Sequence, residues 1–256
     1  MGIVEYEKKG HLVTVTMNRP ERLNSIDPEM LAGLREAWRR YQDDDDAWVA
    51  ILTGAGRAFS AGADKSWFTR ALQGEDSVGI FLNEISKDPY WSGRVDKPTI
   101  AAANGYVIGG GLDLFLRADF RVAGESAKFQ LPEVERGNVV ILWDNLPYAI
   151  AAEILAGFPI PAERAYQVGM LNRLVPDDQL LDAARELAEA LLAKPPLPLY
   201  HGLKILRDIK GGGTTISRSL LNHFTTSLSK ELAHTEDYQE AVAALLEKKK
   251  PTFRRK

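Results

Sequence analysis

The sequence predicts an α/β domain followed by a helical region, and three observations carry that prediction. Short strands alternate with helices through the first half of the chain. Two segments, Trp48–Thr53 and Thr99–Ala103, are continuous apolar runs, which is typical of buried parallel strands. From Leu180 onward the apolar residues recur only at helical spacing. A chain of 256 residues has room for one large domain and an appendage.

Local patterns predict the first elements in order. Residues 3–7 and 11–17 form a hairpin across a Lys-Lys-Gly turn, because the second segment alternates polar and apolar residues. Asp27 is a predicted helix cap, with Pro28 at the first helical position. Apolar residues then recur at helical spacing from Leu31 to Tyr41, and an acidic run ends this helix before the buried strand Trp48–Thr53.

The middle of the chain repeats the order of strand and helix. Residues 66–93 are predicted to be helical and irregular, and the buried strand 99–103 follows them. Further predicted elements are a helix from Gly109 to Leu116, strands at 120–123 and 128–131, and a helix over 144–156.

The last part is predicted to be helical. Leu180, Ala184, Leu187 and Leu191 form one apolar stripe, and the Lys194–Pro198 segment breaks that helix. We therefore place a boundary here, with one domain over 1–195 and a helical region over 196–256.

Composition excludes several classes of protein. The formal charge is −3, which argues against bulk nucleic-acid binding. The absence of cysteine removes disulfides, thiol nucleophiles and thiolate-bound zinc, and four scattered histidines do not suggest a metal site. No apolar run approaches about 18 residues and no signal peptide is visible. We therefore expect a cytoplasmic protein with no metal and no membrane partner.

Two glycine-containing segments could carry chemistry. Residues 57–64 form a loop of small residues after a buried strand, which can expose backbone N–H groups. The alternative is a tight turn with Asp64 as a helix cap. In residues 104–113, three glycines at a helix start leave N–H donors suited to an anion or a developing oxyanion. Here the alternative is a helix that packs closely on a sheet.

Two acids stand beside these segments. Glu133 follows a predicted strand and a proline, and it lies 20 residues after Asp113. Two carboxylates at such junctions could form an acid/base pair. Two solvated surface acids are the alternative, since most Asp and Glu residues are exposed.

Taken together, these segments resemble the enoyl-CoA hydratase/isomerase superfamily, also called the crotonase family. The resemblance covers nearly the whole chain, and its pieces occur in the family's order. They are Asn18-Arg19-Pro20 with Asn24, Ala61-Gly62-Ala63-Asp64, Asn104-Gly105, Gly109 to Gly111, Pro132-Glu133, Ala165-Gly169-Leu171-Asn172-Val175 and Glu247 to Phe253.

The resemblance implies a spiral of β-β-α units that binds an acyl-CoA over residues 1–195. It also implies that residues 196–256 are a helical oligomerisation region that builds homotrimers or hexamers. No separate cofactor is expected, because CoA is part of the substrate.

The same resemblance implies the site residues. The backbone amides of Ala63 and Gly110 would form the oxyanion hole for the thioester oxygen. Asp113 and Glu133 would share one water: one carboxylate takes a proton as the water oxygen attacks Cβ, and the other holds the water and delivers a proton to Cα. Ala61 would belong to the substrate-binding loop.

Binding of CoA would involve residues outside the reacting centre. By resemblance, Arg57 lies near the nucleotide end of CoA, Asp64 belongs to the loop that binds the substrate, and Lys248 reaches in from a neighbouring subunit. Cations there would suit the phosphates. The alternative for Lys248–Lys250 is a solvated basic cluster.

The sequence departs from the family pattern at two places. Asp113 stands where hydratases have Glu, and its side chain is shorter by about 1.5 Å. Relatives that isomerise dienoyl-CoAs also carry Asp there, but their further acid corresponds to Ile141 here.

The second departure is a bulky segment, 139–144, in place of a Pro/Gly-rich turn. Trp143 could wall the acyl pocket or belong to the core, and Asp144 could be a helix cap or a third acid. Trp67 and Phe68 could also line the pocket. Residues of this size favour a branched or cyclic acyl group.

The leading hypothesis is an enoyl-CoA hydratase-type lyase, which adds water to a 2-enoyl-CoA or removes it. The alternative is an isomerase that moves a double bond in an enoyl- or dienoyl-CoA with one carboxylate as proton shuttle. An RNA-binding or non-catalytic protein on the same scaffold is a third hypothesis.

Overall fold

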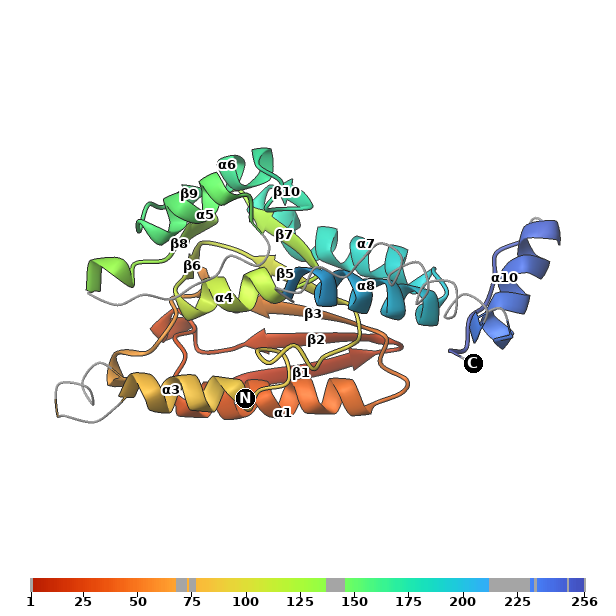
Figure 1. Cartoon of the computed structure of the whole chain (residues 1–256), viewed down its shortest axis with the longest axis horizontal. Coiled ribbons are helices and arrows are strands. Elements are labelled where there is room, and N and C mark those ends of the chain that lie inside the picture. The colour runs from red at the N-terminus through yellow and green to blue at the C-terminus, as the bar shows by residue number, and fades with distance from the viewer. Residues whose placement is uncertain are drawn as a thin grey trace. The chain divides into compact units, whose positions relative to one another are not determined.

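A computed structural model of the chain describes residues 2–67, 73, 77–136, 146–211, 231–232, 234–247 and 249–255. The chain divides into two compact units, Met1–Ala188 and Glu189–Lys256. The larger unit contains two β-sheets with helices packed on them, and the smaller unit is helical (Figure 1). The predicted α/β class with a helical C-terminal region is confirmed.

The first sheet has six strands in the order β1-β2-β3-β5-β7-β10. Their bounds are β1 Val4–Lys9, β2 Leu12–Met17, β3 Val49–Gly54, β5 Thr99–Ala103, β7 Phe120–Gly124 and β10 Arg173–Val175. Strands β1 and β2 form the predicted antiparallel hairpin, and the other neighbours are parallel. Every residue of β3 and β5 is buried, as continuous apolar runs predict.

Helix α1, Pro28–Asp43, packs on strands β1 and β2. Asp27 caps it as predicted, because its Oδ1 accepts a hydrogen bond of 2.8 Å from Met30 N. The apolar face of the helix is buried in the core. Helix α3, Ser77–Ser86, lies beside α1 (Figure 1), and an ion pair of 2.9 Å between Arg35 and Glu84 joins the two helices.

The second sheet consists of short strands in the order β4-β6-β8-β9: Ala58–Ser60, Tyr106–Ile108, Lys128–Gln130 and Ile160–Pro161. Strands β4, β6 and β8 are parallel, and each follows a strand of the first sheet after a short turn. The carboxyl ends of β4, β6 and β8 therefore share one edge. The loops that begin at Ala61, Gly109 and Leu131 meet at that edge, and they carry the predicted site residues Ala61, Ala63, Asp64 and Glu133, with Gly110 directly after Gly109.

The remaining helical segments of the larger unit are η1 Pro20–Arg22, α4 Gly110–Arg117, η2 Val134–Arg136, α5 Tyr148–Leu155, α6 Ala162–Gln167, η3 Asp177–Gln179 and α7 Leu180–Leu192, the last of which continues into the smaller unit. The prediction of a helix from residue 144 is wrong at its start, since Leu146 and Pro147 are not helical and α5 begins at Tyr148. Pro147 explains the difference, because a residue before proline is disfavoured in helical conformation. Asp144 itself lies outside the described residues.

The smaller unit contains helices α8, Pro196–Gly211, and α10, Glu236–Glu247. Helix α7 ends at Leu192 before α8 begins, so the predicted break is confirmed. The Asp237 carboxylate accepts hydrogen bonds from the backbone N–H groups of Arg254 and Arg255, at 2.6 and 2.8 Å. The Arg255 guanidinium also stacks over the Tyr200 ring. These contacts fasten the tail to both helices. The trimerisation role expected for residues 196–256 stays a prediction.

Within the described ranges, no helix is both long enough and apolar enough to cross a membrane.

Candidate active site

Ala63 lies in the loop after β4, and its neighbours pair with Ile26. Ile26 N donates to Gly62 O at 2.7 Å, and Asp64 N donates to Ile26 O at 3.0 Å. In such a parallel bridge the residue between the two bonded groups directs its own N–H away from its partner. Among the described residues, Ala63 N has no hydrogen-bond acceptor.

Gly110 begins helix α4. Gly109 has a φ of 54°, in the left-handed region, and its N–H donates to Gln130 O at 2.9 Å. This bond ties the loop after β6 to the end of β8. Gly110 N is the first amide of the helix, so it has no acceptor within the helix and stands at the positive end of the helix dipole.

The two glycine loops are in main-chain contact. A Cβ atom placed on Gly62, whose φ is 81°, would lie 2.5 Å from Ile108 O and 3.2 Å from Gly110 N. A Cβ on Gly111 would meet Ser60 O at 2.6 Å. The amide of Ala63, one residue after Gly62, is therefore close to that of Gly110. Two adjacent N–H donors of this kind can hold a carbonyl oxygen that gains negative charge.

Glu133 lies against the same helix start. A Cβ on Gly109 would be 2.6 Å from Glu133 Oε1, so the carboxylate touches the main chain one residue before Gly110. Its Oε2 atom is shielded from solvent, although the residue as a whole is half-buried. The structure thus brings Glu133, Gly110 and the Ala63 loop together, and their catalytic roles stay predictions.

Asp113 lies one turn into α4, with its side chain 15% exposed. Trp91 Nε1 donates to Asp113 Oδ2 at 2.6 Å, and Arg117 Nε donates to Oδ1 at 3.1 Å. Sequence reasoning missed both partners. The spacing of four residues between Asp113 and Arg117 on a helix was an available signal, but nothing in the sequence links Trp91 to Asp113.

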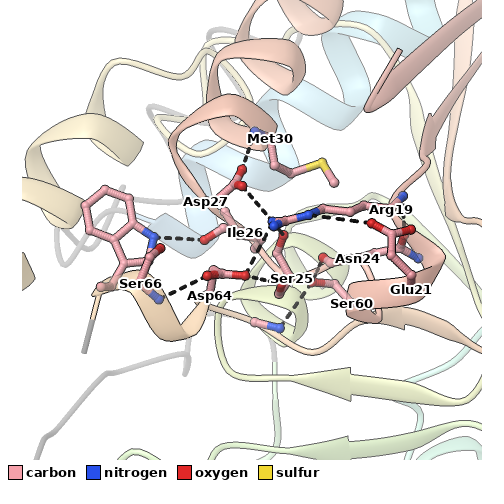
Figure 2. A network of polar contacts seen from close by, with 12 residues as sticks. Arg19, Glu21, Asn24, Ser25, Ile26, Asp27, Met30, Ser60, Asp64 and Ser66 are labelled. Atoms are coloured by element: carbon pink, nitrogen blue, oxygen red, sulfur yellow. Dashed lines mark hydrogen bonds and ion pairs between the residues drawn. The ribbon is translucent and has the colours of Figure 1, made fainter. Parts of the chain in front are cut away.

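Asp64 belongs to a polar network that holds the Ala63 loop (Figure 2). Its Oδ2 accepts from Ser25 Oγ at 2.7 Å and pairs with Arg19 Nη1 at 3.3 Å, and its Oδ1 accepts from Ser66 N at 3.0 Å. Arg19 also pairs with Asp27 at 2.6 Å. Burial opposes ionisation of Asp64, but these hydrogen bonds and the Arg19 charge outweigh it and lower its pKa. The geometry gives Asp64 an anchoring role, and its predicted binding of substrate stays a prediction.

Asn24 and Ser60 complete this anchoring (Figure 2). The buried Asn24 side chain accepts from Arg19 N at 2.9 Å and donates to Ala58 O at 2.7 Å. Ser60 Oγ donates to Asn24 O at 2.8 Å and accepts from Gly62 N at 3.2 Å. The Asn-Arg-Pro motif with Asn24 therefore fixes both ends of strand β4, from which the Ala63 loop departs.

Apolar side chains flank Gly110. A Cβ on Gly110 would contact Ile26 Cδ1 at 3.4 Å and Phe81 Cζ at 3.7 Å. Trp67 is 4% exposed, donates from Nε1 to Ile26 O at 2.9 Å and packs edge-on against Phe81. Trp67 thus packs behind Ile26 and Phe81 in the core, whereas Ile26 and Phe81 lie beside the backbone amide of Gly110. Sequence reasoning missed Ile26 and Phe81, because neither belongs to a motif.

Arg57 and Ala61 lie at opposite ends of β4. Arg57 precedes the strand and lines an open groove of about 840 Å³ together with Tyr106 and Lys128, which begin β6 and β8. Ala61 follows the strand, and its N–H donates to Leu23 O at 2.9 Å, so that amide is already bonded. The groove and the Ala63–Gly110 pair therefore stand at opposite edges of the second sheet.

Three predicted positions, Phe68, Trp143 and Lys248, lie outside the described residues, as do Ile141 and Asp144.

Each of the strands β3, β5 and β7 of the first sheet is followed by a short parallel strand of the second sheet, and the loops after these short strands bring two amides beside a carboxylate. This architecture and site define the class of proteins with the crotonase fold. The family model for enoyl-CoA hydratase/isomerase matches residues 7–256. The chain belongs to the enoyl-CoA hydratase/isomerase family.

Individual relatives agree with this assignment. The chain is 34% identical to enoyl-CoA hydratase EchA19 of Mycobacterium tuberculosis, over 96% of this chain and 94% of the relative. It is 35% identical to carnitinyl-CoA dehydratase of Salmonella paratyphi B, over 96% of each. Among solved structures, an enoyl-CoA hydratase/carnithine racemase from Magnetospirillum magneticum matches with a TM-score of 0.87 and 30% identity, covering 100% of this chain and 97% of that one.

Proposed function

We propose that this protein is a hydro-lyase that adds water to a 2-enoyl-CoA thioester or removes it from the hydroxyacyl product. One observation carries the proposal: the main chains of Gly62 and Gly110 touch, with a carboxylate, Glu133, against the neighbouring Gly109. The names of two relatives, a hydratase and a dehydratase, support water chemistry over other reactions of the family.

In the proposed reaction the thioester oxygen accepts hydrogen bonds from Ala63 N and Gly110 N. As water oxygen bonds to Cβ, the C=C electrons move toward Cα and the thioester, and the carbonyl oxygen becomes enolate-like. Donors aimed at that developing charge stabilise the transition state, and losing one typically costs about 3 kcal/mol. The positive end of α4 adds to this stabilisation at Gly110.

The two acids divide the work. One carboxylate takes a proton from the attacking water and passes a proton to Cα, which completes the β-hydroxyacyl thioester and leaves that carboxylate ionised again. We assign this proton transfer to Glu133, because its carboxylate lies against Gly109, next to the Gly110 amide. We assign the holding of the water to Asp113, whose carboxylate is fixed by two donors. No cofactor apart from the CoA of the substrate takes part.

An isomerase is the second candidate, and the same two donors on Asp113 favour it. A carboxylate that is fixed by Trp91 and Arg117 is a weak proton carrier, and isomerisation requires only one moving acid, Glu133. Ile26 and Phe81, beside Gly110, support an acyl chain that is apolar near its carbonyl.

The deciding experiment is a panel of straight, branched, cyclic and aromatic enoyl-CoAs with mass-resolved products. A product heavier by one water supports the hydro-lyase, and a shifted double bond at unchanged mass supports the isomerase. Glu133→Gln should lower kcat by at least about 10². Glu135→Gln is the matched control, because this exposed carboxylate lies two residues further on. Equal activity of both variants would remove Glu133 from the mechanism.

A further inference from the structure

We infer that Trp91 is a positioning residue, which holds the Asp113 carboxylate in the orientation that hydration requires; the inference rests on the proposed function. No motif of the sequence includes Trp91.

Within the described part of the chain, the carboxylate of Asp113 accepts hydrogen bonds from Trp91 and Arg117, which lie on different elements. The indole N–H of Trp91 reaches Oδ2 at 2.6 Å from the segment after α3, and Arg117 Nε reaches Oδ1 at 3.1 Å from the same helix as Asp113. With a donor on each oxygen, the plane of the carboxylate is fixed.

The indole is itself held rigidly. Trp91 is 4% exposed, and its turn is closed by the buried carboxylate of Asp88, whose Oδ1 accepts from Tyr90 N at 2.8 Å and Trp91 N at 3.1 Å. The Tyr90 hydroxyl donates to Leu114 O at 3.2 Å. The turn is thus fastened to α4 at two consecutive residues, Asp113 and Leu114, within the first two turns after Gly110.

This arrangement gives a reason for aspartate at position 113. The shorter side chain has one torsion fewer than glutamate, and a fixed indole within hydrogen-bond distance suits a carboxylate that does not move. The acids then divide the work: Asp113 is a fixed anion that orients the water, and Glu133 is the group that exchanges its proton. Misplacing a reacting group by about 1 Å can cost about 10²-fold in rate.

The test compares Trp91→Phe with Trp38→Phe. Both changes replace a buried indole in the same aromatic core, since Trp38 stacks on Tyr90 with a centroid distance of 4.3 Å. Trp38 Nε1, however, has no hydrogen-bond partner among the described residues. Only Trp91→Phe therefore removes a hydrogen bond. We expect it to lower kcat for hydration at least about tenfold more than Trp38→Phe does, with KM within about twofold.

A second readout separates positioning from general damage. Exchange of the Cα proton of a saturated acyl-CoA with D₂O requires Glu133 and the two amides, but no attacking water. In Trp91→Phe this exchange should fall by less than about threefold while hydration falls at least about tenfold. A loss of exchange as large as the loss of hydration, or hydration equal to that of Trp38→Phe, would overturn the inference.

Arg117→Gln keeps the inference testable if Trp91→Phe does not fold. Arg117 is half exposed, and its removal should again depress hydration more than exchange. Arg39→Gln is the control, since Arg39 also pairs with an acid of its own helix, Glu36, on an exposed surface away from Asp113. Equal effects on hydration and exchange would overturn the inference here too. Absence of turnover of any enoyl-CoA by the unmodified protein would overturn the proposed function and the inference together.

Discussion

The contact between the two glycine loops can be tested by Gly62→Ala. The added Cβ would lie 2.5 Å from Ile108 O and 3.2 Å from Gly110 N, whereas ordinary contacts begin near 3.4 Å. Both opposing atoms belong to the main chain, so no side chain can rotate out of the way. The loops must separate by roughly 0.9 Å, which is the scale at which misplaced groups lose about 10²-fold in rate.

The substitution also has a backbone cost, because Gly62 has a φ of 81°. Placing a Cβ in the left-handed region destabilises the folded state by about 1–2 kcal/mol. Gly169→Ala is the matched control, since its φ is 75° and nothing lies within 4 Å of the added Cβ. It shares the backbone cost without the displacement.

The assay combines thermal unfolding with steady-state hydration of the best substrate in the panel. Both variants should lose about 1–2 kcal/mol of stability from the backbone term. Only Gly62→Ala should also lose about 10²-fold in kcat. A Gly62→Ala enzyme within threefold of the Gly169→Ala enzyme would refute the claim that these two loops form the site of the reacting oxygen.

Three further predictions concern groups around the site. Burial raises the pKa of Asp88 to about 6, so the ionised carboxylate destabilises the folded protein above that pH, and protonation removes this cost as the pH falls. The unfolding free energy of Asp88→Asn, relative to that of the unmodified protein, should therefore decline by about 1.5 kcal/mol from pH 8 to pH 5. Thermal unfolding at several pH values measures this, and a difference that stays constant with pH would contradict it. Arg57→Gln should raise KM about fivefold for an enoyl-CoA but not for the matching pantetheine thioester, and an equal rise would show that Arg57 does not meet the nucleotide. Asp64→Ala should lower the free energy of unfolding by about 1–3 kcal/mol and should also lower kcat. If calorimetry shows unchanged stability and kinetics show unchanged kcat, Asp64 does not anchor the loop.

Patterns in the sequence were sufficient to predict the longer elements of the first sheet and the helix that packs on it. The hairpin β1–β2, the Asp27-capped helix α1 and the buried strands β3 and β5 occur where alternation, capping chemistry and apolar runs predict them. Strands β4 and β6 were not predicted, because they lie within residues 57–64 and 104–113, whose glycines and small residues indicate loops. Their pairing depends on the turns that lead out of the first sheet.

The sequence by itself determined the family, the glycine loops and the candidate acids, since a motif records which residue types are adjacent along the chain. Only the tertiary structure decided which of these groups touch. It placed Glu133 against Gly109, turned Asp64 into an anchor for the loop through Arg19, and brought Trp91 to Asp113 across 22 residues. The physical reason is that a hydrogen bond or close contact requires side chains from separate elements to meet, and their meeting follows from how the helices and sheets pack.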